Sequence, residues 1–162
     1  MPLTYSVDAD EPLVFLTAEG ELSASDLLAA RELYKTDARI TPEHRGIFDL
    51  RRVTKFALRS DEVRMLAGSR GSIGKISTQT YVAIVSSTPE SFGLARMYEM
   101  ARSDTSDTMR VFDRYDDALS WIRATYPPEL RARFQNRDAS AGVEPHDDGL
   151  APGSVDRPAD FR

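Results

Sequence analysis

The chain has 162 residues, of which 41% are hydrophobic. A chain of this length can bury the core of one domain without help from disulfides or metals. It contains no cysteine, which excludes disulfides, thiolate metal sites and cysteine nucleophiles. The net charge is −5, and residues 136–162 alone carry six acidic and three basic side chains. The eighteen arginines are scattered along the sequence, so no basic stripe predicts binding to nucleic acid.

No segment has the pattern of a membrane span or of an export signal. The stretch Met1–Ser6 has no basic region, and the longest apolar runs, such as Tyr81–Val85, have the length of a strand. We therefore expect a cytoplasmic protein without a transmembrane segment.

Two strands and a helix are expected in the first part of the chain. Thr4–Val7 alternates weakly and Leu13–Ala18 is mostly apolar, which is typical of an edge strand paired with a buried strand in a hairpin. Gly20 is expected to end the second strand. Ser23 and Asp26 have the spacing of a capping box and predict a helix that continues to about residue 35. One face of this helix is apolar and is expected to lie against the sheet, with Leu27, Ala30 and Tyr34 on it.

Strands and helices then alternate. The further strands are expected at Gly46–Leu50, Thr80–Val85 and Thr108–Phe112. The further helices are expected to begin at caps formed by Ser60, Thr88 and Asp113, and the last of them to end before Pro127-Pro128.

The resulting order, ββαβαβαβα, predicts an α/β fold with a mixed, mostly parallel five-stranded sheet and four helices. Residues 1–126 are expected to form this domain, and residues 127–135 to form a connecting segment. Residues 136–162 are rich in Pro, Gly and Asp without periodicity, which predicts a disordered acidic tail.

Motifs that would indicate catalysis or cofactor binding are absent from the sequence. Five residues rather than four separate Gly68 from Gly74, and Ile76 stands where a phosphate-binding loop needs serine or threonine. The two histidines, His44 and His146, fall in a loop and in the expected tail. The sequence therefore predicts no enzyme, no metal site and no cofactor.

Two groups of polar residues remain as candidates. Ligands of open α/β sheets usually meet the carboxyl ends of strands, which directs attention to the end of the Gly46–Leu50 strand and the helix start that follows it. The candidates for binding a partner there are Asp49, Arg51, Arg52, Thr54, Ser60 and Asp61. The candidates for the rim of a ligand site are Ser87, Thr88, Arg96 and Tyr98.

Structural roles are the alternative for the same side chains. Asp49 and Arg51 can tie their loop together, while Ser60 and Thr88 can cap helices. Tyr98 can belong to the core with its hydroxyl at the rim.

Several segments together resemble the SpoIIAA-like branch of the STAS superfamily, over about residues 4–126. The segments are Gly46–Leu50 with Val53-Thr54, Val82–Val85, Gly93–Glu99, and Val111-Phe112 with Ala118–Ile122. The resemblance implies a regulatory domain that binds other proteins. In the anti-sigma factor antagonists of that superfamily, a regulatory serine begins the helix after the third strand. Here the nearest hydroxyl is Ser60, and Asp61 stands in place of the glycine of that motif.

The sequence therefore suggests two alternative functions. The first is a non-enzymatic cytoplasmic regulatory or protein-interaction domain, with a protein partner on the segment from Asp49 to Asp61. The alternative is a binder of a small apolar or lipid-like molecule, because the SpoIIAA-like fold is similar to that of the lipid-binding CRAL-TRIO domains. Phe92, Met97 and Met100 would contribute apolar surface to such a site, and plain core packing is the other explanation for them.

Overall fold

A computed structural model of the chain describes residues 2–68, 80–102 and 108–140. The strands are β1 (Leu3–Val7), β2 (Leu13–Ser23), β3 (Arg45–Ala57), β4 (Tyr81–Val85) and β5 (Thr108–Phe112). The helices are α1 (Ala24–Thr36), α2 (Ser60–Gly68), α3 (Pro89–Ala101), α4 (Tyr115–Ala124) and α5 (Pro128–Ser140). The first nine elements confirm the predicted order, and α5 is a helix that the sequence analysis does not predict.

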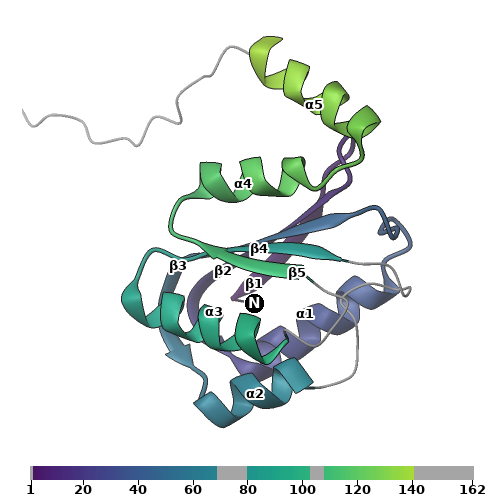
Figure 1. Cartoon of the computed structure of the whole chain (residues 1–162). Helices are drawn as coiled ribbons and strands as arrows, with labels where there is room; N and C mark the ends of the chain where they lie inside the picture. Colours follow the sequence, from purple (N-terminus) through teal and green to yellow (C-terminus); the bar gives the residue numbers. More distant parts are fainter. Residues whose placement is uncertain (1, 69–79, 103–107, 141–162) are drawn as a thin grey trace, which may run out of the picture.

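The five strands form one sheet in the order β1-β2-β3-β4-β5. β1 pairs with β2 in an antiparallel hairpin, and the remaining pairs are parallel. The predicted mixed, mostly parallel sheet is therefore confirmed, with β1 and β5 at its edges. In Figure 1, α1, α2 and α3 lie on one face of the sheet, and α4 and α5 lie on the other side.

Each face of the sheet carries its own core. Val82 and Ile84 of β4 pack on the side of α1–α3, while Ala83 and Val85 pack on the side of α4. The unbroken apolar run of β4 is thus explained by burial on both faces, as is usual for a central parallel strand.

β2 does not end at Gly20, contrary to the prediction. Gly20 lies inside the strand with φ +76°, a left-handed conformation that glycine adopts without steric cost. The strand then continues to Ser23, which pairs with Ala57 of β3.

β3 is also longer than predicted, because it does not end at Leu50 but continues to Ala57. Its pairing with β2 shifts register twice, and each shift gives β3 one extra residue. These bulges keep Leu50, Val53 and Phe56 on the face of α1–α3, although the three residues are three positions apart. A strict alternation would have turned Val53 to the opposite face.

The predicted starts of α1 and α3 are confirmed. The backbone N–H of Ser23 donates to Asp26 Oδ2 at 2.9 Å, and the N–H of Asp26 donates to Ser23 Oγ at 3.3 Å, which completes the capping box of α1. Thr88 caps α3 in the same way, with Pro89 in the first turn.

The predicted caps of the other two helices are wrong. Ser60 is the first residue of α2 rather than its cap, and the Glu62 carboxylate accepts the N–H of Arg59 at 2.8 Å in place of a capping hydroxyl. The cap of α4 is Arg114 rather than Asp113, and Arg114 forms no side-chain capping bond.

Helix α5 occupies most of the predicted connecting segment, residues 127–135. Phe134 of α5 is only 2% exposed, and the centre of its ring lies 6.0 Å from that of Tyr126. Residues 136–140, at the start of the predicted tail, continue the helix, and residues 141–162 lie outside the described residues. No helix within the described ranges is long and apolar enough to cross a membrane.

Candidate functional site

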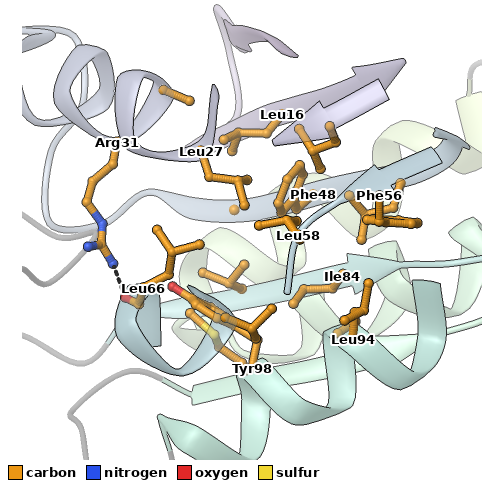
Figure 2. Close-up of a pocket in the computed structure, with 18 of the residues that line it drawn as sticks. Leu16, Leu27, Arg31, Phe48, Phe56, Leu58, Leu66, Ile84, Leu94 and Tyr98 are labelled. Carbon is orange, nitrogen blue, oxygen red and sulfur yellow. Dashed lines mark hydrogen bonds between the residues drawn. The ribbon is translucent and has the colours of Figure 1, made fainter. Parts of the chain in front are cut away.

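A cavity of about 130 Å³ lies between the sheet and helices α1, α2 and α3 (Figure 2). Side chains from β2, β3, β4 and β5 line its sheet side, and side chains from the three helices line the other. Nearly all of them are hydrocarbon, including Leu16, Phe48, Phe56, Leu58 and Ile84. A water molecule in the cavity would therefore find few hydrogen-bond partners, so the space suits an apolar molecule better.

Small residues keep this space open. Ala30 of α1, Gly46 of β3 and Ala95 of α3 all line the cavity. A methyl group at Gly46 would meet Val82 at 3.5 Å, an ordinary contact, so a larger side chain there is not prevented by the backbone. The open volume is thus set by the choice of small side chains at three facing positions.

Polar groups gather at one end of the cavity. Arg31 Nη2 donates to the carbonyl oxygen of Leu66 at 3.2 Å. In Figure 2 the Tyr98 hydroxyl points toward this Leu66 end, while Phe56 and Leu94 lie at the opposite end. The cavity therefore has a long apolar part and a short polar end.

Two arginines hold the last turn of α2, which forms one wall of the cavity. Arg31 comes from α1, and Arg102, which follows α3, donates from Nη1 to the carbonyl oxygen of Ala67 at 3.2 Å. Cations are favourable at this end of a helix because its carbonyl groups carry partial negative charge. The arginines thus fix α2 against α1 and α3.

Asp49 and Arg51, the first two candidates for partner binding, form an ion pair with each other. Arg51 Nη2 donates to Asp49 Oδ2 at 2.7 Å, and Arg51 Nε donates to Oδ1 at 3.0 Å. The guanidinium carbon of Arg51 lies 5.0 Å from the centre of the Tyr115 ring in α4. This pair therefore lies on the α4 side of the sheet, away from the cavity. Asp49 lies inside β3, level with Val85 at the end of β4.

The ion pair makes the stability of the fold depend on pH. Burial alone would raise the pKa of Asp49, but the bonds from the Arg51 side chain and backbone outweigh it and lower the pKa below its usual range. The ionised form is therefore favoured by folding. The ionised Asp49 carboxylate therefore stabilises the fold above its unfolded pKa of about 3.9. This stabilisation is lost as the pH falls through the lower pKa that Asp49 has in the folded protein.

We expect Asp49→Asn to lower the melting temperature at pH 7 and to have a smaller effect near pH 3. Thermal unfolding of both proteins at the two pH values measures this. A loss that is equally large at both values would contradict the assigned pair.

The other partner-binding candidates lie apart from that pair. Arg52 Nη1 is 3.9 Å from Glu19 Oε2, and Arg59 pairs with Asp61 at 2.6 Å. Thr54 is exposed on β3, and Ser60 is exposed at the start of α2. The structure thus brings Asp49 and Arg51 together and distributes the remaining candidates over β3 and α2.

Of the candidates for a ligand rim, only Tyr98 lines the cavity. Thr88 caps α3, Arg96 pairs with Glu99 on the exposed side of the same helix, and Ser87 is exposed. None of Phe92, Met97 and Met100 lines the cavity either, which corrects the apolar surface expected from the sequence. Phe92 is 39% exposed and Met100 is 68% exposed.

The sequence analysis missed most of the lining, although it did place Leu27, Ala30 and Tyr34 on one face of α1, and all three line the cavity. The strand residues gave no separate signal, because a residue beside a cavity and a residue in a filled core have the same apolar character.

Within residues 2–68, 80–102 and 108–140, no group of three or more histidine or carboxylate side chains could hold a metal ion.

No protein-family model matches this chain, and no curated protein matches it. Among solved structures, an uncharacterized protein from the DUF3478 family of Shewanella loihica PV-4 is similar to it. The two share 20% sequence identity with a TM-score of 0.48, over 74% of this chain and 91% of that chain. That protein is described as having a SpoIIAA-like fold, the fold that the sequence resemblance implies here. The strand order and pairing of this chain establish its α/β class and its mostly parallel sheet, and the similarity concerns the fold alone.

Proposed function

We propose that this chain is a non-enzymatic module that binds a small apolar molecule between its sheet and helices α1–α3. The observation that supports the proposal is the cavity of about 130 Å³ with its hydrocarbon lining. An apolar cavity of about 150 Å³ is known to stay dry and to accept benzene. A molecule of that size would restore the van der Waals contacts that the lining side chains lack when the space is empty.

The proposal agrees with the rest of the site. Nearly all of the lining side chains present carbon atoms rather than an acid, a base and a nucleophile in contact, so binding rather than catalysis suits them. The cytoplasmic location expected from the sequence is part of the same proposal.

Filling the cavity should abolish ligand binding. We expect toluene at about 100 times its Kd to stabilise the wild-type protein by about 2.7 kcal/mol, which raises the melting temperature by several degrees. Ala95→Leu places three more carbon atoms in the cavity, so this rise should disappear while unfolding remains cooperative. Differential scanning fluorimetry with and without toluene measures both effects.

Ala101→Leu is the matched control, because Ala101 is exposed on the same helix. It should keep the full response to toluene. An equal response in the Ala95→Leu and wild-type proteins would place binding outside this cavity, and native mass spectrometry of freshly purified protein would then show whether any small molecule is retained.

A second function, binding of a regulatory protein partner, is supported by the pairing of β3. β4 pairs with β3 only over Gly46–Asp49. Among the strands that the structure describes, the rest of β3 pairs with β2 alone. An open strand edge is a common place for another chain to add. The candidates Arg51, Arg52 and Thr54 lie on this stretch.

Substitution of the two arginines tests this second function. We expect the double variant Arg51→Ala/Arg52→Ala to lose a partner that wild-type protein captures from its native host, because both side chains are exposed along the stretch. Ser60→Asp should also change capture, since added negative charge at a helix start meets a favourable dipole but the repulsion of Asp61 and Glu62. Quantitative mass spectrometry of the captured proteins measures this, with Arg133→Ala as a control on α5. If every variant captured the same proteins as wild type, the partner would not bind at the β3 edge or at the start of α2.

A further inference from the structure

Tyr98 presents a hydroxyl to a cavity that is otherwise nearly all hydrocarbon. Its ring is half-buried in α3 and lines the cavity. Figure 2 shows the oxygen directed toward the Leu66 end of the space. With the residues that the structure describes, this hydroxyl forms no hydrogen bond.

Other tyrosines of the fold use their hydroxyls differently. Tyr5 donates to Asp37 Oδ2 at 2.6 Å, and Tyr126 donates to Glu11 Oε1 at 3.1 Å. Each of these hydroxyls thus contributes to the fold through a carboxylate. The Tyr98 hydroxyl is instead placed where a molecule in the cavity would meet it.

The two arginines near this end of the cavity donate hydrogen bonds to backbone carbonyls. Arg31 donates to the Leu66 carbonyl and Arg102 to the Ala67 carbonyl, both in the last turn of α2. Their positive charge is directed at the negative end of the helix dipole. An anionic ligand would have to leave water for a cavity that is lined almost entirely by hydrocarbon, which is unfavourable.

We propose that the ligand of the cavity is an uncharged, ring-sized molecule with a single hydroxyl-type group that hydrogen-bonds to Tyr98. This inference rests on the proposed apolar-ligand function and adds the chemistry of the ligand to it. The apolar body occupies the space between Phe48, Phe56 and Ile84, and the hydroxyl faces the polar end.

Three probes of the same ring size separate these properties: toluene, 4-methylphenol and 4-methylbenzoate. Isothermal titration calorimetry at pH 7 with each probe should show 4-methylphenol binding to the wild-type protein at least ten times more tightly than 4-methylbenzoate. Tyr98→Phe should weaken binding of 4-methylphenol by about 3- to 10-fold, the effect of one hydrogen bond. The affinity for toluene should remain within a factor of two. Tyr81→Phe removes a hydroxyl on the opposite face of the sheet and should change neither affinity.

The outcomes distinguish this inference from the function on which it rests. If toluene binds but Tyr98→Phe leaves the affinity for 4-methylphenol unchanged, or if 4-methylbenzoate binds as tightly as 4-methylphenol, the inference is overturned and the apolar-ligand function stands. If none of the probes binds to the wild-type protein, both are overturned. The comparison of 4-methylphenol with 4-methylbenzoate needs only wild-type protein, so it tests whether the ligand is uncharged even if a variant fails to fold.

Discussion

Replacing Arg123 with methionine is expected to lower the free energy of unfolding by about 3–5 kcal/mol, the usual cost of breaking a buried ion pair from one side. Arg123 of α4 donates from Nε and Nη2 to the two carboxylate oxygens of Glu11, each at 3.0 Å. Glu11 lies between β1 and β2 and is only 4% exposed. Without Arg123, its carboxylate remains buried with the Tyr126 hydroxyl as a partner but without its cation.

Urea unfolding of wild-type and Arg123→Met proteins measures this loss. Adding Glu11→Gln to Arg123→Met should recover part of it, because the unpaired charge is then removed. Arg52→Met is the matched control. Arg52 and Glu19 are both 72% exposed at 3.9 Å, so its effect should stay within about 0.5 kcal/mol. If Arg123→Met and Arg52→Met had the same effect, Glu11 would not depend on Arg123 for its charge.

The second large effect is expected at Phe134, on the helix that the sequence analysis does not predict. Phe134→Ala should lower the free energy of unfolding by about 3–5 kcal/mol, because it removes a buried ring from the core beside Tyr126. A loss of this size would mean that the stable domain extends past residue 126, the boundary expected from the sequence.

Chemical denaturation followed by circular dichroism provides the measurement. Glu129→Gln changes an exposed residue in the first turn of the same helix and should cost less than 1 kcal/mol. A loss below about 1 kcal/mol for Phe134→Ala would indicate that α5 adds little to the core.

The sequence predicted those elements whose local signals agree with the global fold. The capping box at Ser23, the Thr88-Pro89 helix entry and the apolar run of β4 each depend on neighbouring residues only, and all three are confirmed. Alternation of strands and helices then restricted the topology, since parallel strands require crossover connections.

The same local reasoning failed where a longer-range contact decides the structure. The charged pair Arg51-Arg52 suggested the end of a strand, but it lies at a bulge that pairing with β2 imposes on β3. For α5, Pro128 was interpreted only as a stop for the preceding helix, although proline also favours the first position of a helix. With Leu130 and Phe134 as its only large apolar residues, α5 has a weak helical pattern, and its burial depends on the core formed by α4.

The candidate site was predictable only in part. The apolar face of α1 was predicted, and Tyr98, which was named as a candidate for the rim of a ligand site, lines the cavity. The cavity itself arises from the sizes of Ala30, Gly46 and Ala95 in relation to one another. Facing positions on different elements cannot be matched from a single sequence, so the space that they leave could not be anticipated.

Because of its two bulges, β3 needs a fixed number of residues between Leu50 and Phe56. Leu50, Val53 and Phe56 reach the same face only because each bulge inserts one residue between them. Deleting a single residue between Leu50 and Phe56 would turn the rest of the strand over and carry Phe56 away from the cavity. Among related chains, residues 50–56 of β3 would therefore tolerate substitutions far more readily than insertions or deletions. The spacing of its apolar residues would be a better marker of the cavity than their identity.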